Sequence, residues 1–249
     1  MFANIGTYPP VGLFSNTHII TICVCFVCVG FAVWLTRKMT KETYFKCLKI
    51  FAIVLTILEI FKIVWTISIG ETRLDSWFPL YFCSLFLYAL WFAVSKNDHI
   101  KNMGLSFIAI AALIAGVVFI IMPTTSFNLF PIFHFQSIYS MLFHSLMVYS
   151  EIMLYVTKSY KLNLKSVGYY FAFCAMFMII AIGLNSYFGS NMMFLRDPAK
   201  IPIPLLFTIK AFSPSLFTLT MAAVYTLVMG FGMLGIYKLI ETLIKKKTK

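Results

Sequence analysis

The chain has 249 residues, of which 61% are hydrophobic and 11% charged, and its 20 Lys and Arg against 8 Asp and Glu give a net charge of +12. A soluble domain is about a quarter charged and could not hide so many apolar side chains from water, so the composition excludes a water-soluble globular protein. The basic residues lie in short segments between apolar runs, which favours membrane orientation over nucleic-acid binding as the reason for the charge.

Apolar runs follow one another along the whole chain. A helix needs about 20 apolar residues to cross the hydrocarbon core of a bilayer. The runs are separated by short polar connections and by two longer, proline-rich ones at 123–134 and 189–214. We therefore expect an all-α fold, a single domain of seven transmembrane helices. The expected spans are residues 18–36, 44–70, 77–94, 103–122, 135–157, 167–188 and 215–240.

The basic residues are divided unequally between the two sides of this expected bundle. Segments 37–49, 96–101, 158–165 and 238–249 hold 15 Lys and Arg residues on one side, the other side holds 4, and Lys62 lies inside a span. Cytoplasmic loops carry the excess of Lys and Arg. The sequence thus predicts a multi-pass protein of the cell membrane with its N-terminus outside and its C-terminus in the cytoplasm.

Six cysteines lie inside or beside apolar stretches, so we expect no disulfide framework. Cys25 and Cys28 have the C-x-x-C spacing, but they lie in an apolar helix without further ligands. We expect no metal and no cofactor.

Ionisable side chains inside a membrane are costly, so each is a functional candidate. In the second span, Glu59 and Lys62 are three residues apart and therefore neighbours on one helix. They form either a mutually neutralising pair or part of a binding site.

The fifth span carries a polar stripe made of Ser137, Ser140, His144, Glu151 and Tyr155. Their spacing places them on one face of a helix, which should point into the bundle. Serine and tyrosine often only join neighbouring helices by hydrogen bonds. A histidine in lipid has little structural use, so His144 favours a function.

The third expected span begins with a capping residue, Asp75, has Pro79 in its first turn, and contains Cys83. On a straight helix Cys83 lies about 9 Å below Trp77, whereas His144 lies about 15–20 Å below the start of its own span. A tilt or a bend near Pro79 is needed to bring Cys83 and His144 to one depth.

Several segments in order resemble the YwaF family of integral membrane proteins, which includes the eukaryotic transmembrane protein 164 group. They are residues 14–18 (FSNTH), 78–83 (FPLYFC), His144, and 185–195 (NSYFGSNMMFL) followed by Pro198. The resemblance covers nearly the whole chain. It implies a seven-helix fold, in agreement with the charge distribution.

The resemblance also implies a chemistry, because eukaryotic relatives are described as lipid acyltransferases that pass an acyl group through a cysteine thioester. Carried over, Cys83 is the nucleophile and His144 the general base, with Asn185 or Asn191 as candidate donors to an oxyanion. Tyr81 departs from the family pattern Pro-Leu-His-Leu-Cys, which has a histidine there.

Two functions from different classes follow. The first is a lipid acyltransferase or hydrolase, with membrane lipids as substrates and Cys83 and His144 as catalytic residues. The alternative is a transporter or substrate-binding membrane protein with a polar pathway lined by the second, fifth and sixth helices. The identity of the base (His134 or His144), the oligomeric state and a role as a subunit of a larger complex stay open. The expected substrate-binding residues are Glu59, Tyr81, His134, Ser140, Asn185 and Asn191.

Overall fold

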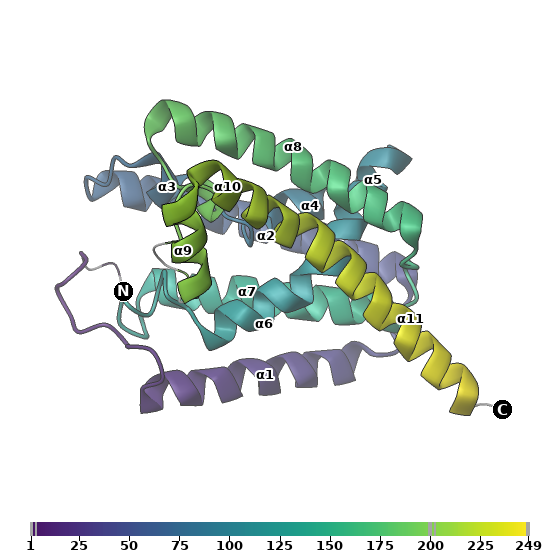
Figure 1. The fold of residues 1–249 in the computed structure, drawn as a ribbon. Coiled ribbons are helices and arrows are strands. Elements are labelled where there is room, and N and C mark those ends of the chain that lie inside the picture. The colour runs from purple at the N-terminus through teal and green to yellow at the C-terminus, as the bar shows by residue number, and fades with distance from the viewer. Residues whose placement is uncertain (1, 3, 199–200, 202, 248–249) are drawn as a thin grey trace.

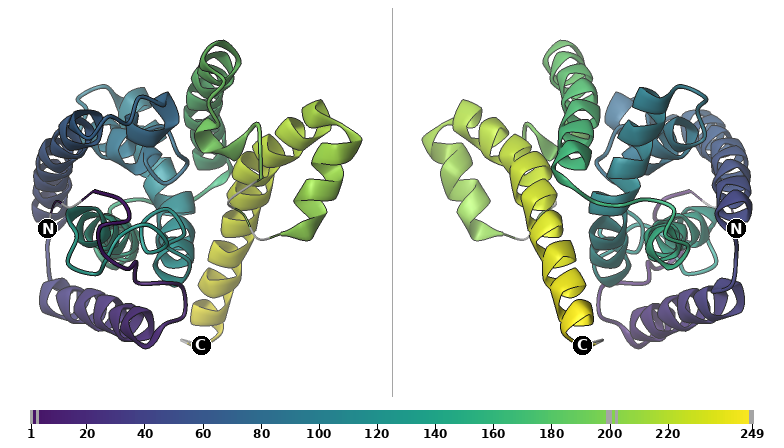
Figure 2. Two further views of the ribbon diagram at one scale, coloured as in Figure 1. Left: turned by 90° about the vertical axis from the view of Figure 1, so that its left-hand side faces the viewer. Right: turned by 90° about the vertical axis from the view of Figure 1, so that its right-hand side faces the viewer.

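A computed structural model describes residues 2, 4–198, 201 and 203–247, and this part of the chain is all-helical, with no β-strand. Lys200 and Lys249, which entered the charge count, lie outside the described residues. The helices α1, α7 and α8 run in roughly the same direction, α9 runs across them and α11 runs obliquely, and α6 and α7 lie between α1 on one side and α8 on the other (Figure 1). Viewed from the end, they form a bundle from which the α9–α10 hairpin projects (Figure 2).

The long helices correspond to the apolar runs of the sequence. Two of them are continuous helices with a short π-helical stretch inside: α5, η1 and α6 form one, and α10, η3 and α11 form the other. The elements are α1 (Asn16–Thr36), α2 (Lys41–Ser68), α3 (Leu74–Trp77), α4 (Leu85–Ala93), α5 (Asp98–Phe107), η1 (Ile108–Ala112), α6 (Leu113–Ile121), α7 (Phe135–Val156), α8 (Leu164–Phe188), η2 (Met192–Phe194), α9 (Pro204–Phe212), α10 (Pro214–Ala223), η3 (Val224–Val228) and α11 (Met229–Lys247).

Five helices are long and apolar enough to cross a membrane: Asn16–Thr36, Lys41–Ser68, Asp98–Ile121, Leu164–Phe188 and Pro214–Lys246. Their outer faces are apolar as well as their inner ones. On α2 the exposed residues include Ile57 and Ile60, whereas Glu59 between them is buried. A surface with exposed isoleucine and buried glutamate suits lipid and not water, so the bundle is an integral membrane structure.

The third expected span, residues 77–94, differs from the single helix that its apolarity predicts. Only α3 and the nine-residue α4 are helical, and residues 78–84 between them are not. Pro79 explains the break, because a residue before proline avoids the helical region and Phe78 is extended (φ −77°, ψ 126°). The first turn of the expected helix is thus replaced by an irregular segment that carries Cys83.

The fifth expected span is the 22-residue helix α7, whose polar stripe has a structural partner in η1. A π-helical turn disturbs the regular backbone hydrogen bonds. The Leu113 N–H donates to Glu151 Oε2 at 2.6 Å, and the Tyr155 hydroxyl donates to the Ala109 carbonyl at 2.7 Å. Two of the five stripe residues, Glu151 and Tyr155, therefore complete the hydrogen bonding of the neighbouring helix.

Two glycines allow close helix packing around this centre. A Cβ on Gly104 of α5 would lie 2.4 Å from the Ala89 carbonyl oxygen of α4, and a Cβ on Gly116 of α6 would lie 2.8 Å from the His144 carbonyl oxygen of α7. Glycine is thus required where α5 meets α4 and where α6 meets α7.

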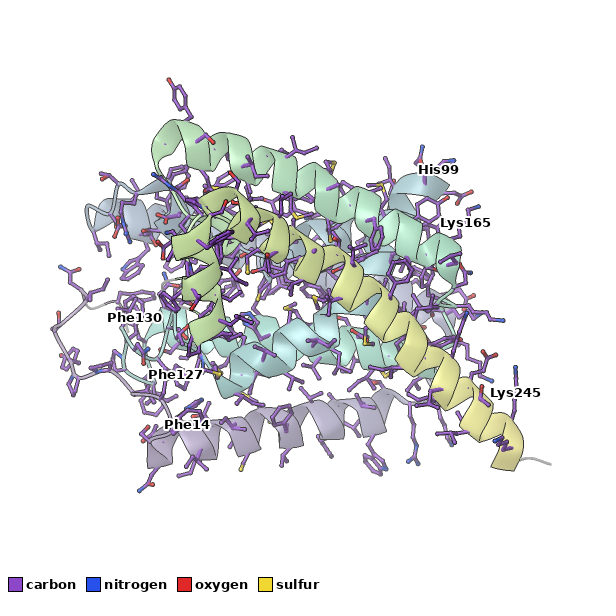
Figure 3. All side chains as sticks on the ribbon, viewed as in Figure 1. Phe14, His99, Phe127, Phe130, Lys165 and Lys245 are labelled. Atoms are coloured by element: carbon purple, nitrogen blue, oxygen red, sulfur yellow. The ribbon has the colours of Figure 1, made fainter. Side chains whose placement is uncertain are left out.

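The two ends of the bundle differ in charge. Lys165 and Lys245 lie towards one end, while Phe14, Phe127 and Phe130 lie towards the other (Figure 3). The helix ends follow the same division, since α1 ends at Thr36 and α2 begins at Lys41 at the basic end. The segregation of basic residues that the sequence predicts is present among the described residues.

Candidate functional site

A cavity of about 1070 Å³ lies inside the bundle. Its walls come from α2, the irregular segment 78–84, α6, the first half of α7, and the α9–α11 region. Five of the eight site residues expected from the sequence line it: Glu59, Tyr81, Cys83, Ser140 and His144.

Cys83 lies in the irregular segment, two residues before α4 begins, and its side chain is partly buried. Its backbone carbonyl accepts a hydrogen bond from the Phe86 N–H at 3.0 Å, which ties it to the first turn of α4. The segment places Cys83 on the same cavity as His144 without requiring equal depth on two straight helices. Because Cys83 is not in a helix, the depth expected for a straight third helix does not apply to it.

His144 is buried on α7, and its ring stacks on Phe119 of α6 with centroids 3.6 Å apart and planes 4° apart. Nδ1 lies 2.7 Å from the Ser140 carbonyl oxygen. A carbonyl can only accept, so Nδ1 donates, and the neutral ring carries its lone pair on Nε2. Nε2 has no hydrogen-bond partner among the described residues. His144 therefore has a fixed ring that lines the cavity and a buried acceptor nitrogen without a hydrogen-bond partner.

Glu59, Lys62 and Tyr139 form a connected group on the cavity wall. One carboxylate oxygen of Glu59 pairs with the Lys62 ammonium, and the other accepts a hydrogen bond from the Tyr139 hydroxyl. Glu59 is thus both a member of a neutralising pair and part of the cavity lining. A neutralising pair and a part of a binding site, the two alternatives for Glu59 and Lys62, are therefore compatible.

Tyr81 and Ser140 line the cavity in different ways. The Tyr81 ring packs against Phe194 with centroids 5.0 Å apart, which joins the irregular segment to the loop after α8. The Ser140 carbonyl holds His144 in place. Tyr81 thus keeps an aromatic side chain at the cavity where the family pattern has a histidine.

Asn185 and Asn191 lie away from the cavity lining, and their side chains build the loop after α8. Asn185 accepts from the Met192 N–H at 2.7 Å and donates to the Met192 carbonyl at 3.1 Å. Asn191 accepts from the Asp197 N–H at 2.9 Å and donates to the Asp197 carbonyl at 2.8 Å. Their amides are engaged by backbone groups on either side of Phe194, which itself lines the cavity.

The other two buried histidines lie outside the cavity lining. His134 is the N-cap of α7, where its Nδ1 accepts from the Gln136 N–H at 3.1 Å, and its ring stacks on Phe130 at 4.3 Å. His18 accepts from the Phe14 N–H at 2.9 Å and contacts the Ile120 carbonyl at 3.2 Å, joining α1 to the end of α6. Neither ring lines the cavity, which leaves His144 as the histidine that does.

Among the polar cavity residues that the sequence did not single out are Tyr139 and Tyr225. Tyr139 could have been found by helical spacing, because it adjoins the polar stripe, whereas Lys62 was already paired with Glu59 by its spacing. Tyr225 belongs to η3, and its ring stacks on Phe82 at 4.3 Å beside Cys83. No sequence signal marks a π-helical turn, so its place could not have been predicted. In the described part of the chain, no group of three His, Cys, Asp or Glu side chains could hold a metal ion.

The fold and cavity define a helical integral membrane protein with a cysteine, a histidine and an ion pair facing one internal space. A family model, that of the TMEM164 family, matches residues 13–234. The chain belongs to the TMEM164 family. Neither the curated proteins nor the solved structures include one that matches it.

Proposed function

We propose that the protein is a lipid acyltransferase that carries the acyl group on Cys83 and uses His144 as its general base. The observation that carries this proposal is the shared cavity, which holds a thiol and an imidazole whose Nε2 is free. A thiol becomes a strong nucleophile only when a base removes its proton, and histidine is the side chain suited to this near neutral pH. The volume, about 1070 Å³, is at the upper end of ligand sites and suits a lipid.

In the first half-reaction, His144 Nε2 takes the thiol proton of Cys83, and the thiolate attacks the ester carbonyl of a donor lipid. The ester C–O bond breaks, and the departing alkoxide takes the proton back from His144. This leaves an acyl thioester on Cys83 and releases a lysolipid.

In the second half-reaction, His144 takes the proton from the hydroxyl of an acceptor lipid, whose oxygen attacks the thioester. The C–S bond breaks, and His144 returns the proton to the Cys83 thiolate. If water is the acceptor, the same steps hydrolyse the lipid. The enzyme therefore needs no metal or cofactor for this sequence.

Access from the lipid phase supports the same function. Val118 of α6 and Ile203 before α9 both line the cavity, and they are 56% and 49% exposed. Apolar side chains that are shared between the cavity and the outer surface give a lipid chain a continuous apolar route. We propose that the substrate enters sideways, between α6 and the α9–α10 hairpin.

We propose that the protein has seven spans in the cell membrane, with its N-terminus outside and its C-terminus in the cytoplasm. The charge division supports this orientation. Besides the five long apolar helices, α7 supplies one span, and the broken α3–α4 segment supplies the other. The broken span can persist in lipid because its irregular backbone is inside the bundle and lines the cavity.

Acyl transfer in proteoliposomes tests the proposal. The vesicles contain a phospholipid with a deuterated acyl chain and an unlabelled lysophospholipid, and mass spectrometry follows the label into new phospholipid. We expect transfer by the parent chain and by Cys28→Ser, whose cysteine is exposed on α1, and its loss in Cys83→Ser. Equal transfer by Cys83→Ser and the parent would refute the role of Cys83.

A second function, transport or substrate binding, is favoured by the ion pair on the cavity wall. Charged residues inside a membrane often mark a substrate pathway. Solute flux in proteoliposomes that responds to Glu59→Gln but not to Cys83→Ser would support this alternative. Flux unchanged by Glu59→Gln would remove its main support.

A further inference from the structure

The cavity has a mostly buried polar wall and an apolar wall, and the segment after α2 adds the exposed Arg73, which pairs with Glu71. The polar wall belongs to α2 and the start of α7, and the apolar wall belongs to α6, α10, η3 and α11. Such a division suits an amphipathic ligand that places its head against one wall and its chains against the other. The polar wall consists of Glu59, Lys62, Thr66, Gln136 and Tyr139, and the apolar wall of Ile114, Val118, Phe119, Met221, Val224 and Met229.

Lys62 is the cation of the polar wall, and it is held in a fixed place. Glu59 pairs with it, and Glu59 is itself held by the Tyr139 hydroxyl from α7. The Lys62 side chain is only 16% exposed. An ammonium group has three N–H donors, and Glu59 is the one partner of Lys62 among the described residues. Two donors of a positioned cation therefore remain for a ligand.

A buried ion pair rarely persists for stability alone, because apolar residues of similar size usually serve as well. Inside a membrane the cost of the charges is higher still. Lysine binds phosphate as a point charge, and a phosphate can accept the N–H donors of Lys62 that Glu59 leaves free. We propose that Lys62, positioned by Glu59 and Tyr139, binds the phosphate of a lipid head group in this cavity.

The inference rests on the proposed function in so far as the cavity takes an acylated lipid, and it adds where that lipid's head group lies. The phosphate contacts α2, and the chains lie along α6, α10 and α11. In a glycerophospholipid the acyl esters are only a few bonds from the phosphate. Binding at Lys62 therefore holds the esters inside the cavity that Cys83 and His144 also line.

Lipid binding by the purified full chain in detergent tests this site. Native mass spectrometry measures the affinity for three probes: dioleoylphosphatidylglycerol, dioleoylglycerol without phosphate, and glycerol 3-phosphate without chains. The test variant combines Glu59→Gln with Lys62→Met, so that no unpaired carboxylate stays buried. Lys165→Met, at the basic end of the bundle, is the matched control. A thermal unfolding midpoint close to that of the parent shows that the double variant is folded.

We expect the double variant to lose at least tenfold in affinity for phosphatidylglycerol and to keep its affinity for dioleoylglycerol, while Lys165→Met binds both as the parent does. Equal binding of phosphatidylglycerol by the double variant and the parent would overturn the site. Glycerol 3-phosphate bound as tightly as phosphatidylglycerol would overturn its assignment to a lipid. If lipid binding depends on Lys62 but Cys83 never carries an acyl group, the phosphate site stands and the proposed acyl transfer fails. If Cys83 is acylated equally with and without Lys62, the acyl transfer stands and the phosphate site fails.

Discussion

At the scale of single residues, the orientation of His144 decides what the cavity can do. Its Nδ1 is committed to the Ser140 carbonyl at 2.7 Å, and Phe119 fixes the plane of its ring. This leaves Nε2 as the one nitrogen able to accept a proton. An orienting hydrogen bond on one ring nitrogen and a free lone pair on the other are what a general base needs.

His144→Gln should lower acyl transfer by about 10²–10⁴-fold, the usual contribution of a general base, because glutamine cannot take the thiol proton. His134→Asn tests the competing base, since asparagine is itself a good N-cap and preserves the start of α7. We expect transfer by His134→Asn within about threefold of the parent. Turnover assays on both variants in proteoliposomes make the comparison, and a larger loss in His134→Asn would assign the base to His134 instead.

The site residues expected on α2 and α7 line the cavity, whereas the two asparagines expected at the end of α8 and in the loop after it do not. Glu59 and His144 stand out because an ionisable side chain in an apolar run is conspicuous. Asn185 and Asn191 lie outside the cavity lining, and their amides are engaged by Met192 and Asp197 backbone, because asparagine serves loop geometry as readily as ligand binding. Only the fold distinguishes the two uses.

At the scale of elements, α7 and the helix formed by α5, η1 and α6 depend on each other. At the π-helical turn, the Leu113 N–H donates a hydrogen bond to Glu151, and the Ala109 carbonyl accepts one from the Tyr155 hydroxyl. Of the five stripe residues, Glu151 and Tyr155 bond to the helix around η1, whereas Ser140 and His144 line the cavity. A stripe read from spacing alone cannot show this division, because it depends on a backbone irregularity in another helix.

Glu151→Leu should destabilise the protein by about 1–3 kcal/mol, because the buried Leu113 N–H then has no acceptor. Glu151→Gln keeps a carbonyl oxygen at the same place and should cost clearly less. Thermal unfolding in detergent compares the two variants. Equal losses in both would show that the charge, and not the hydrogen bond to η1, is what matters.

Gly116→Val should force α6 away from α7 at the level of His144, since the added Cβ would lie 2.7 Å from Val148 Cγ2 and 2.8 Å from the His144 carbonyl oxygen. Overpacking of this kind costs about 1–3 kcal/mol, and the displacement of His144 should lower acyl transfer as well. Gly183→Val is the matched control, because nothing lies within 4 Å of a Cβ there. Unfolding midpoints and turnover are measured together, and a Gly116→Val variant as stable and active as Gly183→Val would contradict the packing.

At the scale of the whole molecule, composition predicted the membrane class, and hydropathy found the long helices within a few residues. The third span could not be predicted as broken, because its apolarity is that of a continuous helix and Pro79 also fits the first turn of one. Here the backbone restriction at Phe78 prevails over the hydropathy pattern. The extension of α11 to Lys247 likewise lies beyond the apolar run that marked it.

The proposed orientation predicts which ends of the bundle a membrane-impermeant maleimide can reach. In intact cells, Thr72→Cys beyond α2 should be labelled from outside, and Thr242→Cys near the end of α11 should not be. Both positions are exposed in the structure, so permeabilised cells should show labelling of both. Labelling of Thr242→Cys but not Thr72→Cys in intact cells would invert the topology.

The central claim is that Cys83 carries an acyl group taken from a lipid in this cavity, and its most direct test is the intact mass of the purified chain after incubation with phospholipid. We predict an increase by the mass of one acyl group, which neutral hydroxylamine removes because it cleaves thioesters. The adduct should be absent in Cys83→Ser and present in Cys28→Ser. No adduct on the parent chain, or an equal adduct on Cys83→Ser, would contradict the account.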